Sequence, residues 1–249
     1  MVLAPPQLTA RPRPSERAPP AAAGAPRRWM ACHPPSVEPG RLFSDPTAAP
    51  IPSQQTSRHL GRPDPVEALA RLLAGNHQFT LGNSPPAGAP NGGADPQPFA
   101  VVVGCIDARV PVEAVFGQGV GAICVVRSAG HVLDRAVMGS IEFTVTDLQV
   151  SLVVVLGHDD CRAVAAASAA VRTGHRPAGA RQFLIDQIAP AMPAAGSADH
   201  SLEKVTRSHI HRTLATLRHA NYLKQAIAAR RIDVVGGIYR LESGRVEML

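Results

Sequence analysis

The chain has 249 residues, of which 45% are hydrophobic and only 4% aromatic, and this length fits one α/β domain with additional sequence. The formal net charge is +6, but residues 1–62 hold eight Arg against three acidic residues, which leaves 17 basic and 16 acidic residues in the remainder. A nearly neutral domain with few aromatic side chains argues against nucleic-acid binding, which needs a basic surface and, for single strands, aromatic stacking.

Residues 1–62 differ in composition from the rest of the chain. They contain 13 of the 24 Pro residues, mixed with Ala, Arg and Ser, and their apolar residues show no period. We therefore expect a disordered tail, followed by one domain over residues 63–249. No apolar run suits a signal peptide or a membrane span. The tail could be a linker, a weak contact for an anionic surface, or sequence upstream of a true start such as Met30.

Ordered structure is expected from Asp64-Pro65, a typical helix start, and the helix should run to Gly82. Residues 83–98, rich in Pro, Gly and Asn, predict an exposed loop. Strands are then expected at 99–105, 123–127, 151–157 and 232–238, with an edge strand at 245–249. Helices are expected at 111–116, 134–148, from 159 through 163–171, at 180–192 and at 201–230. This alternation predicts an α/β fold in which helices flank a mainly parallel sheet.

Metal-binding side chains follow two of the predicted strands. Cys105 and Asp107 come after the first strand, and His158 and Cys161 come after the third. The carboxyl ends of parallel strands meet at one edge of a sheet, so two thiols, an imidazole and a carboxylate should gather there as a tetrahedral zinc site. In an extended chain Cys105, Asp107 and Arg109 would point the same way.

The spacing of His158 and Cys161 predicts that both lie on one face of the first turn of a helix. The N-terminus of that helix should lower the pKa of the Cys161 thiol. Cys32 lies in the tail, and Cys124 lies in an apolar run where a buried, inert thiol is expected. The cysteines lack the Cys-x-x-Cys spacing of thiol oxidoreductases and form no disulfide framework, so we expect a reducing compartment, the cytoplasm.

From Val66 to Val246 the sequence resembles the β-class carbonic anhydrases. The resemblance rests on Cys105-Ile-Asp-Ala-Arg109-Val-Pro111, Phe116-Gly-Gln118, Val125-Val-Arg127-Ser-Ala-Gly130, Gly139-Ser-Ile-Glu142-Phe143, Val154-Val-Leu-Gly-His158-Asp-Asp-Cys161 and Val235-Gly-Gly-Ile-Tyr239. It implies the fold of that family, one zinc ion per chain with Cys105, His158 and Cys161 as ligands, and a homodimer or homotetramer.

The same resemblance implies the reversible hydration of carbon dioxide to bicarbonate by attack of zinc-bound hydroxide. Asp107 would be the fourth zinc ligand in a closed state and would pair with Arg109 in an open state, in which it orients the hydroxide. Gln118 would donate a hydrogen bond to a substrate oxygen, although a surface turn residue is an equally good interpretation of that position.

Several positions depart from the family pattern. Arg162 stands where Gly is usual after the second Cys, Gly117 and Ala122 stand where acidic residues are usual, and Ala108 replaces a common Ser. Arg162 could narrow the pocket or pair with one of the preceding acids, Asp159 and Asp160. These departures leave a second interpretation open, a catalytically weak relative in which zinc is structural or the domain is a bicarbonate-responsive interaction module.

Overall fold

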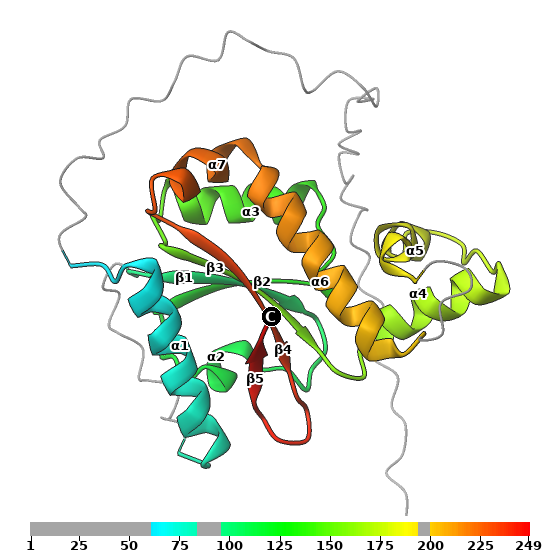
Figure 1. Ribbon diagram of the computed structural model, residues 1–249, viewed down its shortest axis with the longest axis horizontal. Coiled ribbons are helices and arrows are strands. Elements are labelled where there is room, and N and C mark those ends of the chain that lie inside the picture. Colours follow the sequence, from blue (N-terminus) through cyan, green and yellow to red (C-terminus); the bar gives the residue numbers. More distant parts are fainter. Residues whose placement is uncertain (1–60, 84–95, 194–199) are drawn as a thin grey trace, which may run out of the picture. The chain divides into compact units, whose positions relative to one another are not determined.

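The computed structural model of this chain describes residues 61–83, 96–193 and 200–249, and a five-stranded sheet forms its centre (Figure 1). The strand order is β2(Ile123–Ser128), β1(Ala100–Cys105), β3(Leu152–His158), β4(Asp233–Tyr239) and β5(Val246–Met248). The first four strands are parallel, and β5 runs antiparallel to β4. The predicted α/β fold with a mainly parallel sheet is confirmed. The predicted tail up to residue 60 and most of the predicted loop at 83–98 lie outside the described residues.

The described residues also form seven α-helices and two short 3-10 turns. These are α1(Pro65–Thr80), α2(Val112–Val115), η1(Ala129–His131), α3(Arg135–Thr146), α4(Arg162–Thr173), α5(Arg181–Ile188), η2(Ala189–Ala191), α6(Leu202–His219) and α7(Asn221–Ala228).

The helices cover both faces of the sheet. One face packs against α3, α6 and α7, through apolar side chains such as Ile141, Leu214 and Leu223. The other face packs against α1 and α2, where Leu72 and Phe116 are buried. Figure 1 shows these two layers, with α4 and α5 lying to one side of the sheet. Because helices cover both faces, the central strands β1 and β3 are buried along their whole length, which explains their continuous apolar sequences.

Helix α1 begins where the sequence predicts. Asp64 accepts a hydrogen bond from the backbone N–H of Glu67, whose side chain accepts from the backbone N–H of Asp64, and this reciprocal pair satisfies two donors of the first turn. Just before it, the guanidinium of Arg62 donates to the carbonyls of Leu148 and Gln149. Arg62, which the sequence analysis assigned to the tail, therefore contacts the fold.

Two helical predictions differ in detail. The stretch 201–230 is not continuous, because Ala220 has an extended backbone with ψ of 134° and separates α6 from α7. The stretch 180–192 ends as a 3-10 turn that contains Pro190, since proline lacks the N–H that would continue the helix. Gly75 allows α1 to approach the end of α2, because a Cβ there would lie 1.8 Å from the carbonyl oxygen of Phe116.

Candidate metal centre

Three metal-binding side chains meet at the carboxyl end of the two central strands. Cys105 is the last residue of β1, His158 is the last residue of β3, and Cys161 immediately precedes α4. Their ligand atoms lie within 4.8 Å of one another, and all three residues are buried. The predicted position of His158 on a helix is wrong, because β3 extends one residue further than expected and a turn at 159–160 joins it to α4. That turn, and not a shared helix face, brings His158 and Cys161 together.

The geometry of this group fits a tetrahedral metal ion. The two sulfur atoms lie 3.9 Å apart, far beyond the roughly 2.05 Å of a disulfide and close to the roughly 3.8 Å between two thiolates bound to one tetrahedral zinc. His158 Nδ1 lies 2.7 Å from the carbonyl oxygen of Asp159, an acceptor, so Nδ1 carries the proton. Its Nε2 is then a lone pair, buried and without a hydrogen-bond partner. A zinc ion would satisfy that nitrogen and both sulfurs together.

The thiols and the imidazole influence each other's protonation. The hydrogen bond from Cys161 lowers the pKa of Cys105 to about 4, against the opposing effect of burial. The same contact raises the pKa of Cys161, together with burial. Burial opposes a charge on His158, but its contacts with Cys105 raise the pKa of the ring above its usual value.

The predicted effect of the helix N-terminus on the pKa of Cys161 is present, but it is not the largest one. The N–H groups of Ala163 and Val164 do lower the pKa of the Cys161 thiol, but sharing one proton with Cys105 outweighs them. The two sulfur atoms are close enough to share a proton, and both must be deprotonated to bind a metal ion.

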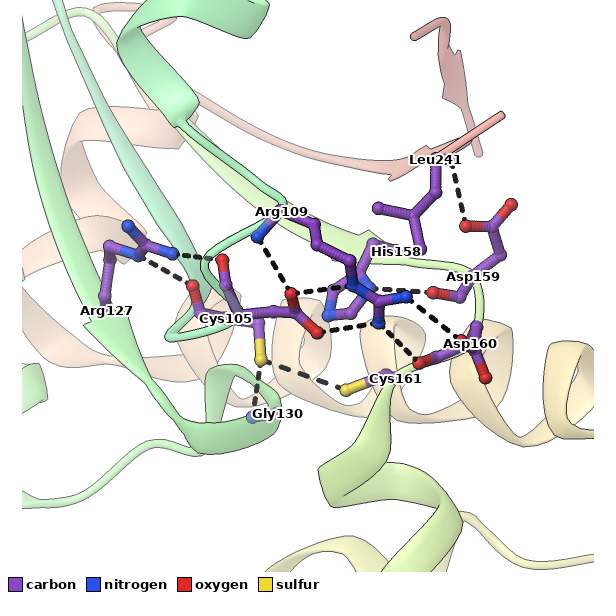
Figure 2. Close-up of polar contacts among 10 residues, drawn as sticks. Cys105, Arg109, Arg127, Gly130, His158, Asp159, Asp160, Cys161 and Leu241 are labelled. Carbon is purple, nitrogen blue, oxygen red and sulfur yellow. Dashed lines mark hydrogen bonds and ion pairs between the residues drawn. The ribbon is translucent and has the colours of Figure 1, made fainter. Parts of the chain in front are cut away.

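Backbone and side-chain donors hold the β1 end in place. The backbone N–H of Gly130 donates to Cys105 Sγ over 3.3 Å, and Arg127 donates to the carbonyls of Cys105 and Asp107 over 2.7 and 2.6 Å (Figure 2). Arg127 and Gly130 were not predicted from the sequence to belong to the site. The parallel pairing of β1 with β2, which sets Gly104 beside Arg127 and Cys105 beside Ser128, is the signal that could have located them.

Asp107 is paired with Arg109 and is not part of the three-residue metal group. Arg109 Nε and Nη2 donate to the two carboxylate oxygens over 3.0 and 2.8 Å, and its backbone N–H donates over 2.9 Å. The expected extended chain is wrong here, because residues 107–110 form a turn closed by the Val110 N–H on the Asp107 carbonyl. Arg109 holds the pKa of Asp107 well below its usual range, so the carboxylate is ionised.

Asp160 provides a second partner for Arg109. Its carboxylate accepts from Arg109 Nη1 over 3.1 Å and its carbonyl accepts from Nη2 over 3.2 Å, while Asp159 accepts from the backbone N–H of Leu241 (Figure 2). Asp160 has a φ of 49°, a left-handed conformation that asparagine and aspartate tolerate better than most residues. The cation that the sequence suggested for these acids was Arg162; instead, Arg109 binds Asp160.

Arg162 lines a cavity of about 920 Å³ beside the metal group. Cys105, Asp107 and Arg109 also line this cavity, and alanines of α4 together with Leu184 and Ile185 make part of its lining apolar. Gln118 does not line it. The Gln118 side chain instead donates to the carbonyl of Phe116 over 2.7 Å, so a single chain does not bring this predicted substrate-binding residue to the metal group.

Comparison with known proteins gives consistent matches. The family model for carbonic anhydrase matches residues 100–246. Carbonic anhydrase 2 of Mycobacterium tuberculosis is 40% identical over 190 residues, covering 73% of this chain and 91% of that protein. The carbonic anhydrase of Mycolicibacterium smegmatis is 40% identical over 192 residues, covering 74% of this chain and 93% of that protein. A tetrameric β-carbonic anhydrase from Sordaria macrospora has a similar structure, with a TM-score of 0.55 at 21% identity over 61% of this chain and 81% of the other.

Among the helices of residues 61–83, 96–193 and 200–249, none combines the length and apolar character that crossing a bilayer requires.

Proposed function

This chain belongs to the β-class carbonic anhydrases, and we propose that it catalyses the reversible hydration of carbon dioxide to bicarbonate and a proton at one zinc ion held by Cys105, His158 and Cys161. The observation that carries the proposal is the unpartnered Nε2 of His158, buried beside two sulfur atoms 3.9 Å apart. A buried polar atom without a partner is costly, and a metal ion is the partner that suits all three groups.

Zinc supplies a Lewis acid that makes a water molecule acidic enough to serve as a nucleophile near neutral pH. Two thiolates and a neutral imidazole around Zn²⁺ would give the site a formal charge of zero. The remaining chemistry belongs to the side chains around it, which must orient the nucleophile and keep the fourth position of the metal free.

Asp107 and Arg109 are suited to both tasks. Oδ1 of Asp107 accepts two hydrogen bonds from Arg109, so its acceptor positions are filled, whereas Oδ2 accepts one and keeps one free. We propose that this free position accepts the O–H of the attacking water and aims its oxygen at carbon dioxide. Arg109 keeps the carboxylate ionised and occupied, which prevents it from becoming a fourth ligand.

We also propose that the protein is a homodimer or homotetramer and acts in the cytoplasm. A similar solved structure is described as tetrameric, and the scarce cysteines suit a reducing compartment. Gln118 would then serve as a substrate donor only after a change in its bond to Phe116 or from a neighbouring copy, since its own chain holds it away from the cavity.

A stopped-flow carbon dioxide hydration assay tests the proposal. Zinc-loaded protein should accelerate hydration, protein stripped with a chelator should not, and added zinc should restore the rate. Stoichiometric zinc without acceleration at any pH between 6.5 and 9 would instead favour the catalytically weak relative.

A further inference from the structure

The turn that donates to Cys105 has an unusual backbone. Gly130 has φ and ψ of 63° and 31°, and the next residue, His131, has a φ of 45°. Two consecutive residues therefore have a positive φ, which residues other than glycine rarely adopt. A Cβ at Gly130 would also lie 3.0 Å from Cδ1 of Ile188 and 3.2 Å from Cβ of Ala163. Such a turn persists only where its surroundings hold it.

One side chain from a distant helix contacts both of these residues. His209, on α6, is 4% exposed, and its Nε2 lies 2.9 Å from the carbonyl oxygen of Gly130. A carbonyl only accepts, so Nε2 carries the proton and donates it. The His209 ring also stacks on that of His131, with centroids 4.5 Å apart and planes 17° apart.

The contacts form a chain from α6 to the metal group. His209 donates to the Gly130 carbonyl, and the Gly130 N–H donates to Cys105 Sγ. The hydrogen bond and the ring stacking together restrict rotation of the turn that carries this N–H. We propose that His209 is a positioning residue for the metal centre, which holds the Gly130 turn so that its N–H stays on the sulfur of Cys105.

This role has a consequence for the metal. A hydrogen bond to a thiolate withdraws electron density from sulfur, so the sulfur donates less to the metal. Without His209 the turn relaxes, the N–H leaves the sulfur, and Cys105 becomes a stronger donor with less support for its orientation. The energy of sulfur-to-metal charge transfer should therefore fall, and metal affinity should fall by about tenfold, as is typical when a residue behind a ligand is lost.

The experiment uses Co²⁺ added to the full, metal-free chain under reducing conditions. In His209→Leu the near-ultraviolet sulfur-to-cobalt band should move to longer wavelength, and competition with a chelator should give about tenfold weaker binding. His209→Gln can still donate from Nε2 and should restore both values toward wild type. His209→Met, which fills similar volume without a donor, gives the same test if the leucine variant does not fold.

Thr213→Val is the matched control. Thr213 is buried one turn further along α6, and its hydroxyl donates to the carbonyl of His209. The Thr213→Val variant should have lower thermal stability, but its sulfur-to-cobalt band should not move. A band and an affinity unchanged in the donor-free variants, with only the melting temperature lowered, would overturn the inference. The inference rests on the proposed metal site, and a wild-type chain that gives no sulfur-to-cobalt band would refute that site itself.

Discussion

Arg109 lies two positions after Asp107 in the sequence and binds its carboxylate through two parallel hydrogen bonds of 3.0 and 2.8 Å. This fork geometry is the arrangement in which arginine recognises a carboxylate most strongly. Asp160 holds the other side of the same guanidinium, so Arg109 bridges the ends of β1 and β3. Asp107 is therefore ionised beside the metal group, but its carboxylate binds the guanidinium of Arg109.

Arg109→Ala should retain zinc but lose carbon dioxide hydration activity by at least about tenfold. Without Arg109, the carboxylate of Asp107 loses the cation that holds it, and it is expected to take the fourth position on the metal. Zinc content measured by metal analysis, alongside stopped-flow rates, separates this effect from loss of the ion.

Arg176→Ala provides the comparison for this variant. It also removes an arginine from an ion pair with an aspartate, Asp186, but that pair is exposed and neither residue lines the cavity. Its rate should equal that of wild type. A near-normal rate in Arg109→Ala would remove the switch interpretation of the pair.

Cys161→Ser should lose most of its zinc, because a serine hydroxyl does not ionise and cannot replace a thiolate ligand. Cys124→Ser is the control, since Cys124 lies in β2 outside the metal group and burial raises its pKa above the ordinary value. Equal zinc content in the two variants would rule out the assigned ligand set.

Arg162→Ala should weaken inhibition by a small anion such as nitrate about two- to fivefold, as expected for the loss of one exposed cation at the wall of the cavity. Salt should reduce the difference between variant and wild type, because exposed charges are screened. Arg172→Ala, on the same helix but not lining the cavity, should leave the inhibition constant unchanged. An identical constant for all three proteins would show that Arg162 does not reach bound anions.

A chain that begins at Gly61 should keep its zinc stoichiometry and its thermal midpoint. A chain that begins at Asp64 should be less stable by about 1–3 kcal/mol, because the bonds from Arg62 to Leu148 and Gln149 are lost. Urea unfolding of both, with Arg62→Ala in the full chain as the matched variant, measures this contribution. Lower stability in the chain that begins at Gly61 would show that the preceding residues also pack.

The buried histidines should make the protein sensitive to acid. Burial holds the pKa of His131 well below 6.5 and also lowers the pKa of His209. Both rings are then neutral in the folded protein but take up protons in the unfolded chain. This difference has no effect on the free energy of unfolding above about pH 7. As the pH falls through 6.5, it lowers the free energy of unfolding by up to about 1.4 kcal/mol per pH unit for each ring.

His131→Asn tests this dependence, since asparagine tolerates a positive φ and does not titrate. Urea unfolding of zinc-loaded protein between pH 7.5 and 5.5 should give a shallower loss of stability in the variant than in wild type. Proton uptake by the zinc ligands is common to both proteins, so equal slopes would mean that His131 contributes nothing.

The sequence was sufficient to locate the parts of the site that depend on strand ends. Cys105 and Cys161 each follow an apolar run, and parallel strands deliver their ends to one edge of a sheet. His158 was predicted on the first turn of a helix, whereas it is the last residue of β3. The sequence around Gly157 and His158 does not show where the strand ends and the next helix begins.

Contacts between distant segments could not be predicted in this way. His209 reaches Gly130 from 79 positions along the chain, and only the packing of α6 on the sheet brings them together. The Asp107–Arg109 pair was expected from the resemblance to the β-class carbonic anhydrases, whereas the spacing suggested only that both side chains point the same way in an extended chain. The carbonyl of Asp107 in the turn at 107–110 also accepts from Arg127, which the pairing of β1 with β2 brings beside it.

The separation of the metal ligands along the chain also sets an order of events during biosynthesis. Cys105 and Cys161 are 56 positions apart, and β2 and α3 must be made before the second of them leaves the ribosome. No short segment can capture zinc by itself, as the compact loop of a zinc finger does. Coordination of the proposed zinc ion by all three ligands would therefore require that β1 and β3 have already paired.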